Sequence, residues 1–275
     1  MKSFFSLVLA IALAITLAFL LLPLVALFLR VPPGDLLGAL GNETAVDALL
    51  VSLKTSLVAN IFILGVGTPA AYFVATRSFP GRKLVVTLIE LPLVLPPAVA
   101  GIGLLATFGR RHGLLGGLLD ASGVSITLTQ TAVVLAIIFV ASPFYLRTAI
   151  AAFSSVDPTY VDASRTLGAS PSRTFWRVAL PLAAGGLSAG AALAFARGLG
   201  EFGATIMFAG SLQGVTQTLP LAIYAQLDLD FDAALAMGAL LVLVCLGVLL
   251  FVKLLPSWTR FASISLAPSA PSSSK

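Results

Sequence analysis

The feature that most constrains this chain is a series of apolar runs, each long enough to cross a lipid bilayer. A helix of about 20 residues spans roughly 30 Å of hydrocarbon. Six segments exceed that length: residues 4–29, 49–75, 85–108, 128–149, 180–208 and 233–255. Because a bilayer core offers no water to hydrogen-bond a free backbone, each segment is expected to be helical. The sequence therefore predicts an all-α membrane protein with six transmembrane helices.

Composition argues against a water-soluble fold. Hydrophobic residues make up 59% of the 275, against only 16 Lys and Arg and 11 Asp and Glu. A soluble domain could not bury so much apolar surface. The first run is longer than the apolar core of a secretory signal, and it ends in Phe28, Leu29 and Arg30 instead of small residues. We expect it to be retained as the first span.

Charge distribution predicts the orientation of the spans. An even number of spans places both termini on one face, with eleven basic residues on that face against four on the other. The eleven are Lys2, Arg77, Arg82, Lys83, Arg147, Arg165, Arg173, Arg177, Lys253, Arg260 and Lys275. The four are Arg30, Lys54, Arg110 and Arg111. Since cytoplasmic loops carry the excess of Lys and Arg, both termini are predicted to be cytoplasmic.

Residues 1–262 are predicted to form a single transmembrane domain, and the Ser/Pro-rich residues 263–275 a disordered tail. Cys245 is the single cysteine and His112 the single histidine, so no disulfide, metal site or catalytic residue is predicted. The basic residues lack the interleaved aromatic residues typical of a nucleic-acid surface. No Gly-x-x-x-x-Gly-Lys-Ser/Thr loop occurs, so nucleotide chemistry is not expected in this chain.

The longest cytoplasmic loop, residues 151–181, contains the clearest local signals. Asp157 suits a helix N-cap, Pro158 the first helical position, and Gly168 the left-handed residue past the helix end. A second short helix is predicted to begin at Ser170. Taken alone, the loop could be an interfacial helix with Trp176 at the lipid headgroups.

The loop also resembles a known motif. Asp162-Ala163-Ser164, then Gly168, then Val178-x-Leu180-Pro181 resembles the "EAA" loop of ABC importer permeases. The resemblance implies a type I permease fold in which the loop forms a coupling helix, seated in a cleft of the ATPase subunit. Asp162 stands where that family has Glu, and Ser164 where it has Ala. The implied coupling residues are Asp162, Ala163, Ser164, Leu167 and Gly168.

The fifth run carries small residues and a pair of charges. Gly186, Gly190, Ala194 and Gly198 recur every four residues, which indicates close helix packing more than contact with substrate. Arg197 and Glu201 lie one helical turn apart. Charges within a span are normally paired or face a cavity, so both a structural ion pair and an anion-attracting role remain open.

Further resemblance follows the fifth run. Residues 200–210 and 213–224 are similar to the molybdate permease branch of the ABC importers, and residues 91–97 fit the same branch. Sulfate permeases are similar only through residues 200–204. The resemblance implies a non-enzymatic homodimeric subunit for molybdate or tungstate in a bacterial or archaeal inner membrane. It implies two copies of a partner ATPase that bind ATP and Mg, an extracytoplasmic molybdate-binding protein, and contact with lipid.

The translocation path is expected to include Arg197, Glu201, Thr205 and Gln217. Neutral hydrogen-bonding side chains are also expected on the outer side: Ser211, Gln213, Thr216, Gln217 and Thr218. Three alternatives remain: a sulfate or thiosulfate ABC permease, a secondary anion transporter, and an intramembrane enzyme. The loop at residues 162–181 favours the importer over the last two.

Overall fold

The computed structural model describes residues 2–110 and 113–254, and this part of the chain is helical with no strands. Arg111, His112, Arg260, Lys275 and the predicted tail lie outside the described residues. The elements in chain order are α1 (Lys2–Arg30), α2 (Pro33–Gly41), α3 (Glu43–Thr76), α4 (Arg82–Val94), α5 (Pro97–Phe108), α6 (Gly116–Ala121), α7 (Gln130–Ser154), α8 (Pro158–Thr166), α9 (Pro171–Thr174), the π-helix η1 (Phe175–Ala179), α10 (Leu180–Leu199), α11 (Gly203–Ala209), α12 (Leu219–Gln226) and α13 (Phe231–Leu254).

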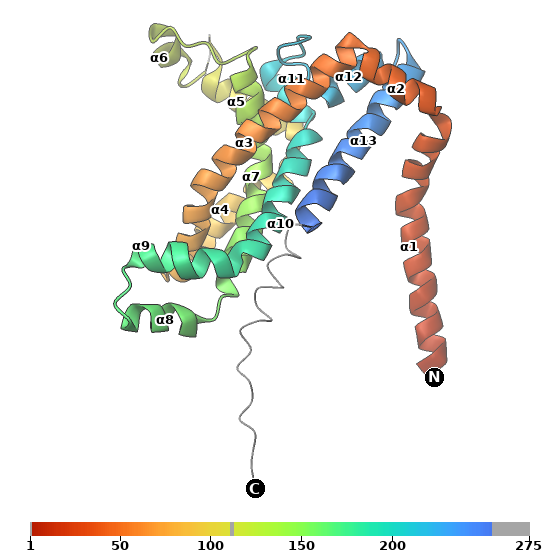
Figure 1. The fold of residues 1–275 in the computed structure, drawn as a ribbon. Coiled ribbons are helices and arrows are strands. Elements are labelled where there is room, and N and C mark those ends of the chain that lie inside the picture. The colour runs from red at the N-terminus through yellow and green to blue at the C-terminus, as the bar shows by residue number, and fades with distance from the viewer. Residues whose placement is uncertain (1, 111–112, 255–275) are drawn as a thin grey trace.

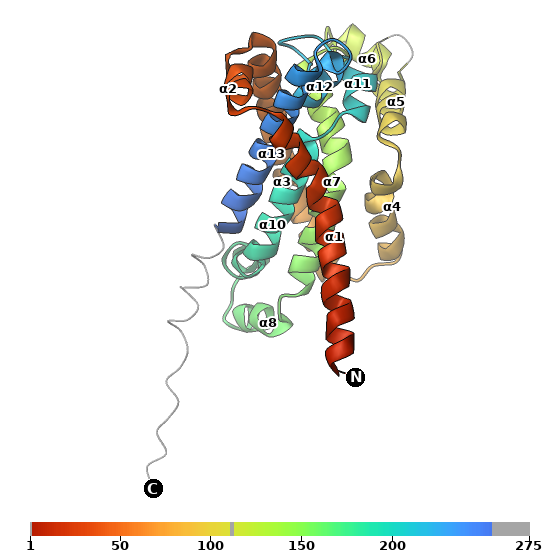
Figure 2. The same ribbon diagram turned by 90° about the vertical axis from the view of Figure 1, so that its right-hand side faces the viewer.

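Within the described residues, five helices are long and apolar enough to cross a membrane, and a bent pair could supply a sixth crossing. The five are α1, α3, α7, the continuous helix α9–η1–α10, and α13. Figures 1 and 2 show that the start of α1 and the helix α8 lie at one end of the molecule, while α2, α6, α11 and α12 lie at the other. The all-helical membrane fold predicted from the apolar runs is confirmed.

The third expected span is not one straight helix. Residues 85–108 form α4 and α5, whose axes meet at 111°. The break falls at Leu95 and Pro96, and both have extended ψ angles. Pro96 and Pro97 remove two backbone donors, and each proline disfavours a helical conformation in the residue before it. Hydrophobicity runs through this break without interruption, so an apolar run alone does not reveal it.

The fifth expected span is shifted towards its N-terminal side. Its helix begins at Pro171 and ends at Leu199, whereas residues 180–208 were expected. Phe202 leaves the helical conformation, and α11 starts as a separate helix after it. The two short helices α5 and α11 then touch closely. A Cβ added at Gly101 would lie 2.7 Å from the carbonyl oxygen of Ala204, and one added at Gly203 would lie 2.7 Å from Pro97 Cβ.

Helix α7 lies at the centre of the bundle and packs against both α3 and α10. Tyr145 of α7 is buried, and its hydroxyl is 2.6 Å from Thr68 Oγ1 of α3. Its ring lies against two glycines, since an added Cβ would be 3.0 Å from the ring at Gly67 and 3.3 Å at Gly190. One aromatic side chain therefore fills the space between three helices.

The small residues of α10 form its contact with α7. A Cβ added at Gly186 would lie 2.5 Å from Ala152 Cβ, and one at Gly198 would lie 2.7 Å from Ile137 Cγ2. Without a hydrophobic driving force between helices in lipid, such close backbone approach supplies much of the packing energy. The helix-packing interpretation of this stripe is confirmed.

Helix α1 stands apart from this bundle along most of its length (Figures 1 and 2). None of its apolar window is buried. Among the described residues, Leu27 and Phe28 near its end, and Val31 just after it, pack with Ala236 and Ala239 of α13. The long apolar surface of α1 is thus free to face lipid or another subunit.

The close packing of the α10 glycine stripe against α7 predicts that a methyl group added to one of its glycines destabilises the protein. Gly186→Ala should destabilise the purified protein in detergent by about 1–3 kcal/mol, because the new Cβ overlaps Ala152. Gly185→Ala is the matched control, since nothing lies within 4 Å of a Cβ at that position. Thermal unfolding measures the difference, and Ala152→Gly should restore much of the loss. Equal melting temperatures for the two alanine variants would contradict the close contact.

Candidate functional site

The loop at one end of the bundle folds as its capping residues predict. The Asp157 side chain caps α8 by accepting a hydrogen bond from the Thr159 amide at 2.9 Å. That bond favours the ionised form and lowers the pKa of the Asp157 carboxyl below its ordinary value. Gly168 has φ of +79°, and the Ala169 amide donates to the Ser164 carbonyl at 3.0 Å. The predicted helix start and stop are confirmed.

The five candidate coupling residues face different ways. Ala163 and Leu167 are exposed, and Leu167 presents 88% of its surface to solvent. Asp162 is exposed as well, with its Oδ1 3.7 Å from Arg165 NH1. Ser164 alone turns inward, where its hydroxyl is 2.9 Å from Thr174 Oγ1. The loop therefore exposes the apolar side chains of Ala163 and Leu167 to solvent. On its opposite face, the Ser164 hydroxyl bonds it to Thr174.

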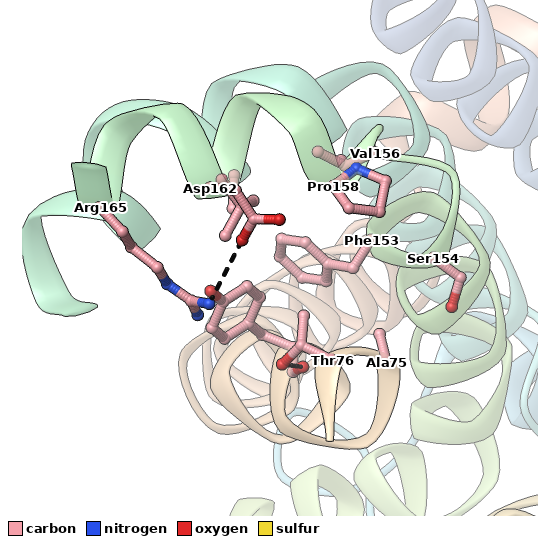
Figure 3. Close-up of a pocket in the computed structure, with 11 residues that line it drawn as sticks. Ala75, Thr76, Phe153, Ser154, Val156, Pro158, Asp162 and Arg165 are labelled. Atoms are coloured by element: carbon pink, nitrogen blue, oxygen red, sulfur yellow. Dashed lines mark hydrogen bonds and ion pairs between the residues drawn. The ribbon is translucent and has the colours of Figure 1, made fainter. Parts of the chain in front are cut away.

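A pocket of about 270 Å³ lies between α8 and the ends of α3 and α7 (Figure 3). Asp162 and Arg165 border it from α8, Thr76 from α3, and Phe153 from α7. Its other lining residues are Tyr72, Ala75, Ser154, Val156, Pro158, Val161 and Ala179. The short helix α8 is thus not packed tightly onto the ends of these spans.

The two charges near the end of α10 form the predicted pair. Arg197 NH2 lies 2.7 Å from Glu201 Oε2, and the Glu201 side chain is 1% exposed against 26% for Arg197. The other carboxylate oxygen of Glu201 accepts a hydrogen bond from the Ala204 amide at 2.7 Å. A buried carboxylate needs such partners to offset its desolvation. Glu201 joins the end of α10 to the start of α11.

The remaining polar candidates differ in accessibility. Thr205, Thr216, Gln217 and Thr218 are buried, while Ser211 and Gln213 are exposed. The expectation that residues 216–218 supply neutral hydrogen-bonding groups on the outer side stays a prediction. Thr216 Oγ1 accepts a hydrogen bond from the Leu212 amide at 2.9 Å, so this side chain folds the loop back on itself.

In the described part of the chain, several buried side-chain oxygen atoms have no hydrogen-bond partner. They are Ser56 Oγ, Asn60 Oδ1, Thr205 Oγ1, Gln217 Oε1 and Thr218 Oγ1. Two of the residues, Ser56 and Asn60, continue a row on α3 that begins at Ser52, whose hydroxyl accepts from the Leu219 amide at 2.7 Å. Buried hydroxyls and amides without partners are uncommon in folded proteins. The Ser52–Leu219 bond places the start of this polar row beside the first turn of α12.

Two side chains of interest were missed from the sequence. Thr174 is buried behind α8, and only the folded loop brings it to Ser164. Glu90 of α4 lies 3.7 Å from Arg147 of α7. Glu90 could have been singled out from the sequence, because a carboxylate inside an expected span normally has a charged partner. Among the described residues, no group of three or more His, Cys, Asp or Glu side chains is placed to hold a metal ion.

Comparisons with known proteins identify the class. Residues 67–261 match the family of binding-protein-dependent transport system inner membrane components. A chain of a bacterial alginate ABC transporter, crystallised with its alginate-bound periplasmic protein, superposes with a TM-score of 0.74 at 17% identity. The match covers 93% of this chain and 94% of that one, and it shows a shared fold. The chain belongs to this family of membrane-spanning transport components and is a multi-pass inner-membrane protein.

Within the family, two relatives differ in degree of similarity. The molybdenum transport system permease ModB of Mycobacterium tuberculosis is 44% identical over 84% of this chain and 88% of its own length. The sulfate transport system permease CysW of Synechococcus elongatus is 35% identical over 73% of this chain and 72% of its own length. Both relatives are permease proteins of transport systems.

Proposed function

We propose that this chain is the permease subunit of an ATP-driven importer for molybdate and tungstate. Its similarity to a molybdenum permease over most of both chains carries the proposal. The sulfate permease CysW is less similar, at 35% identity against 44%, so sulfate or thiosulfate is the second candidate. A secondary anion transporter is disfavoured because the loop around α8 has no role in such a protein.

We further propose that the permease works as a homodimer with two copies of a cytoplasmic ATPase and an extracytoplasmic molybdate-binding protein. The unburied apolar length of α1 supports contact with a second subunit. ATP and Mg are bound by the ATPase, and the exposed Ala163 and Leu167 suit docking in its cleft. The binding protein selects the anion before release, so this subunit needs no tight site of its own.

The proposed orientation places both termini and α8 in the cytoplasm. The end of the molecule that holds α8 also holds the start of α1, the end of α3 and the start of α4 (Figure 1). Arg77, Arg82 and Lys83 lie in the connection between the last two. This concentration of basic residues follows the positive-inside rule.

The proposed translocation path passes Arg197, Glu201, Thr205 and Gln217. The Arg197 side chain is partly exposed, and its guanidinium forms an ion pair with the buried Glu201 carboxylate. An arginine restrained in this way attracts a dianion, and its neighbouring carboxylate weakens the attraction enough to permit release. The buried Thr205 and Gln217 supply neutral atoms that can contact an oxyanion when the subunits move apart.

Uptake by the assembled complex tests the substrate. Vesicles that contain this chain with its ATPase and binding protein should accumulate labelled molybdate only with ATP. Excess tungstate should abolish uptake, and excess sulfate should leave it unchanged. Competition by sulfate would instead identify a sulfate importer, and uptake without ATP would identify a secondary transporter.

Paired substitutions separate the two roles left open for Arg197. Arg197→Gln alone leaves the buried Glu201 carboxylate without its cation, which costs about 3–5 kcal/mol in such sites. We expect less folded protein in this variant and recovery in the double variant Arg197→Gln with Glu201→Gln. If Arg197 attracts the anion, the recovered double variant still takes up molybdate at least tenfold more slowly. Full recovery of uptake would show that the pair is structural only.

Gly168 tests the coupling role of the loop. Gly168→Val places a β-branched residue at φ of +79°, a conformation that such residues rarely adopt, so the end of α8 should be distorted. Membrane insertion and protein level should be retained, while molybdate uptake falls several-fold. Gly81→Val, at φ of +84° in the connection before α4, carries the same backbone strain and is the matched control. Undiminished uptake by the Gly168 variant would exclude the coupling role.

A further inference from the structure

The inward-facing hydroxyl of Ser164 forms a side-chain hydrogen bond that ties α8 to the following helix. Its partner, Thr174 Oγ1, is 2.9 Å away, and Thr174 is 1% exposed. The Ser164 hydroxyl also donates a hydrogen bond to the Val161 carbonyl at 2.8 Å, which orients the hydroxyl along α8. The pocket on the other side of α8 separates the helix from the ends of α3 and α7 (Figure 3). The hydroxyl pair therefore links α8 to the following helix, alongside the short chain segments that join α8 to α7 and to α9.

Thr174 lies at a change of helical type. It is the last residue of α9, and the π-helix η1 begins with Phe175. A π-turn inserts an extra residue into a helix and is frequent at functional sites. Here it leads directly into α10, the helix whose glycine stripe packs against α7. A shift of Thr174 along its axis thus moves the start of α10.

Phe175, the residue after Thr174, contacts two more spans, α3 and α7. The Phe175 ring lies 4.8 Å from that of Tyr72 on α3 and 6.3 Å from that of Phe153 on α7, measured between centroids. Tyr72 and Phe153 are themselves 5.2 Å apart in an edge-to-face arrangement. Packed aromatic rings resist separation, since each pair contributes about 0.5–1.5 kcal/mol beyond its buried area. The three rings join the cytoplasmic ends of α3, α7 and α10.

We propose that the Ser164–Thr174 hydroxyl pair, continued by the ring cluster of Tyr72, Phe153 and Phe175, is the mechanical link that carries displacement of α8 to α3, α7 and α10. Ser164 and Thr174 act as positioning residues and do not contact the transported anion. The proposal rests on the proposed ATP-driven import, and it assigns to Ser164 a role different from that of the exposed Ala163 and Leu167. Those two face the partner, whereas Ser164 faces the chain's own spans.

A double-mutant cycle on the reconstituted complex tests the link. The variants are Ser164→Ala, Thr174→Val and their combination, and the quantity is molybdate transported per ATP hydrolysed. Each single variant should lower this ratio about three- to tenfold, and the combination should lower it no further, because both remove the same bond. Thr174→Ser keeps a hydroxyl and should retain most of the ratio. A merely structural role would change the amount of complex but not the ratio.

Thr148→Val is the matched control, since the Thr148 hydroxyl bonds only the Phe144 carbonyl of its own helix at 2.8 Å, and it should keep the wild-type ratio. A wild-type ratio in both single variants would overturn the link, as would losses that multiply in the combination. If Thr174→Val fails to assemble, Ser164→Ala with Thr174→Ser still decides the question. A wild-type complex that moves sulfate and not molybdate overturns the proposed substrate instead, and the cycle is then measured with labelled sulfate.

Discussion

Close approach of helix backbones in lipid is the interaction on which this structure depends. Apolar side chains gain nothing by leaving lipid for one another, so the bundle relies on shape and on a few hydrogen bonds. Tyr145 meets both requirements, because its ring fits against glycines on two neighbouring helices and its hydroxyl meets Thr68. The glycine stripe of α10 extends the same contact along α7. With α3, α7 and α10 held together in this way, the ends of the bundle can carry shorter and more irregular elements.

Those ends differ in chemistry. At the end that holds α8, exposed apolar and charged side chains surround a short helix held by one pair of hydroxyls. At the opposite end, a buried carboxylate and a group of buried hydroxyls and amides lie among the short helices α11 and α12. The first arrangement suits contact with a protein that moves, and the second suits brief contact with a hydrated anion. Both arrangements fit the permease subunit proposed above.

Local chemistry made part of this structure predictable. Asp157 and Gly168 mark the ends of α8 because capping depends on residues only a few positions apart, and Arg197 finds Glu201 because a helix brings positions four apart together. The sharp bend at Pro96 was missed because a hydrophobic run measures length and not backbone conformation. Thr174 was missed for another reason: its partner is ten residues away across a turn, and only the folded loop brings the two hydroxyls into contact.

The two broken spans have a consequence for how the end of the bundle opposite α8 can move. The chain leaves regular helix at Leu95 and Pro96 before α5, and again at Gly200 to Phe202 before α11. Beyond these breaks, α5 and α11 contact each other through Gly101 and Gly203, too closely for either to slide independently. A rotation at one break must therefore be matched at the other. The paired helices form one packed unit against α7, and Glu201 lies in the connection that leads into α11.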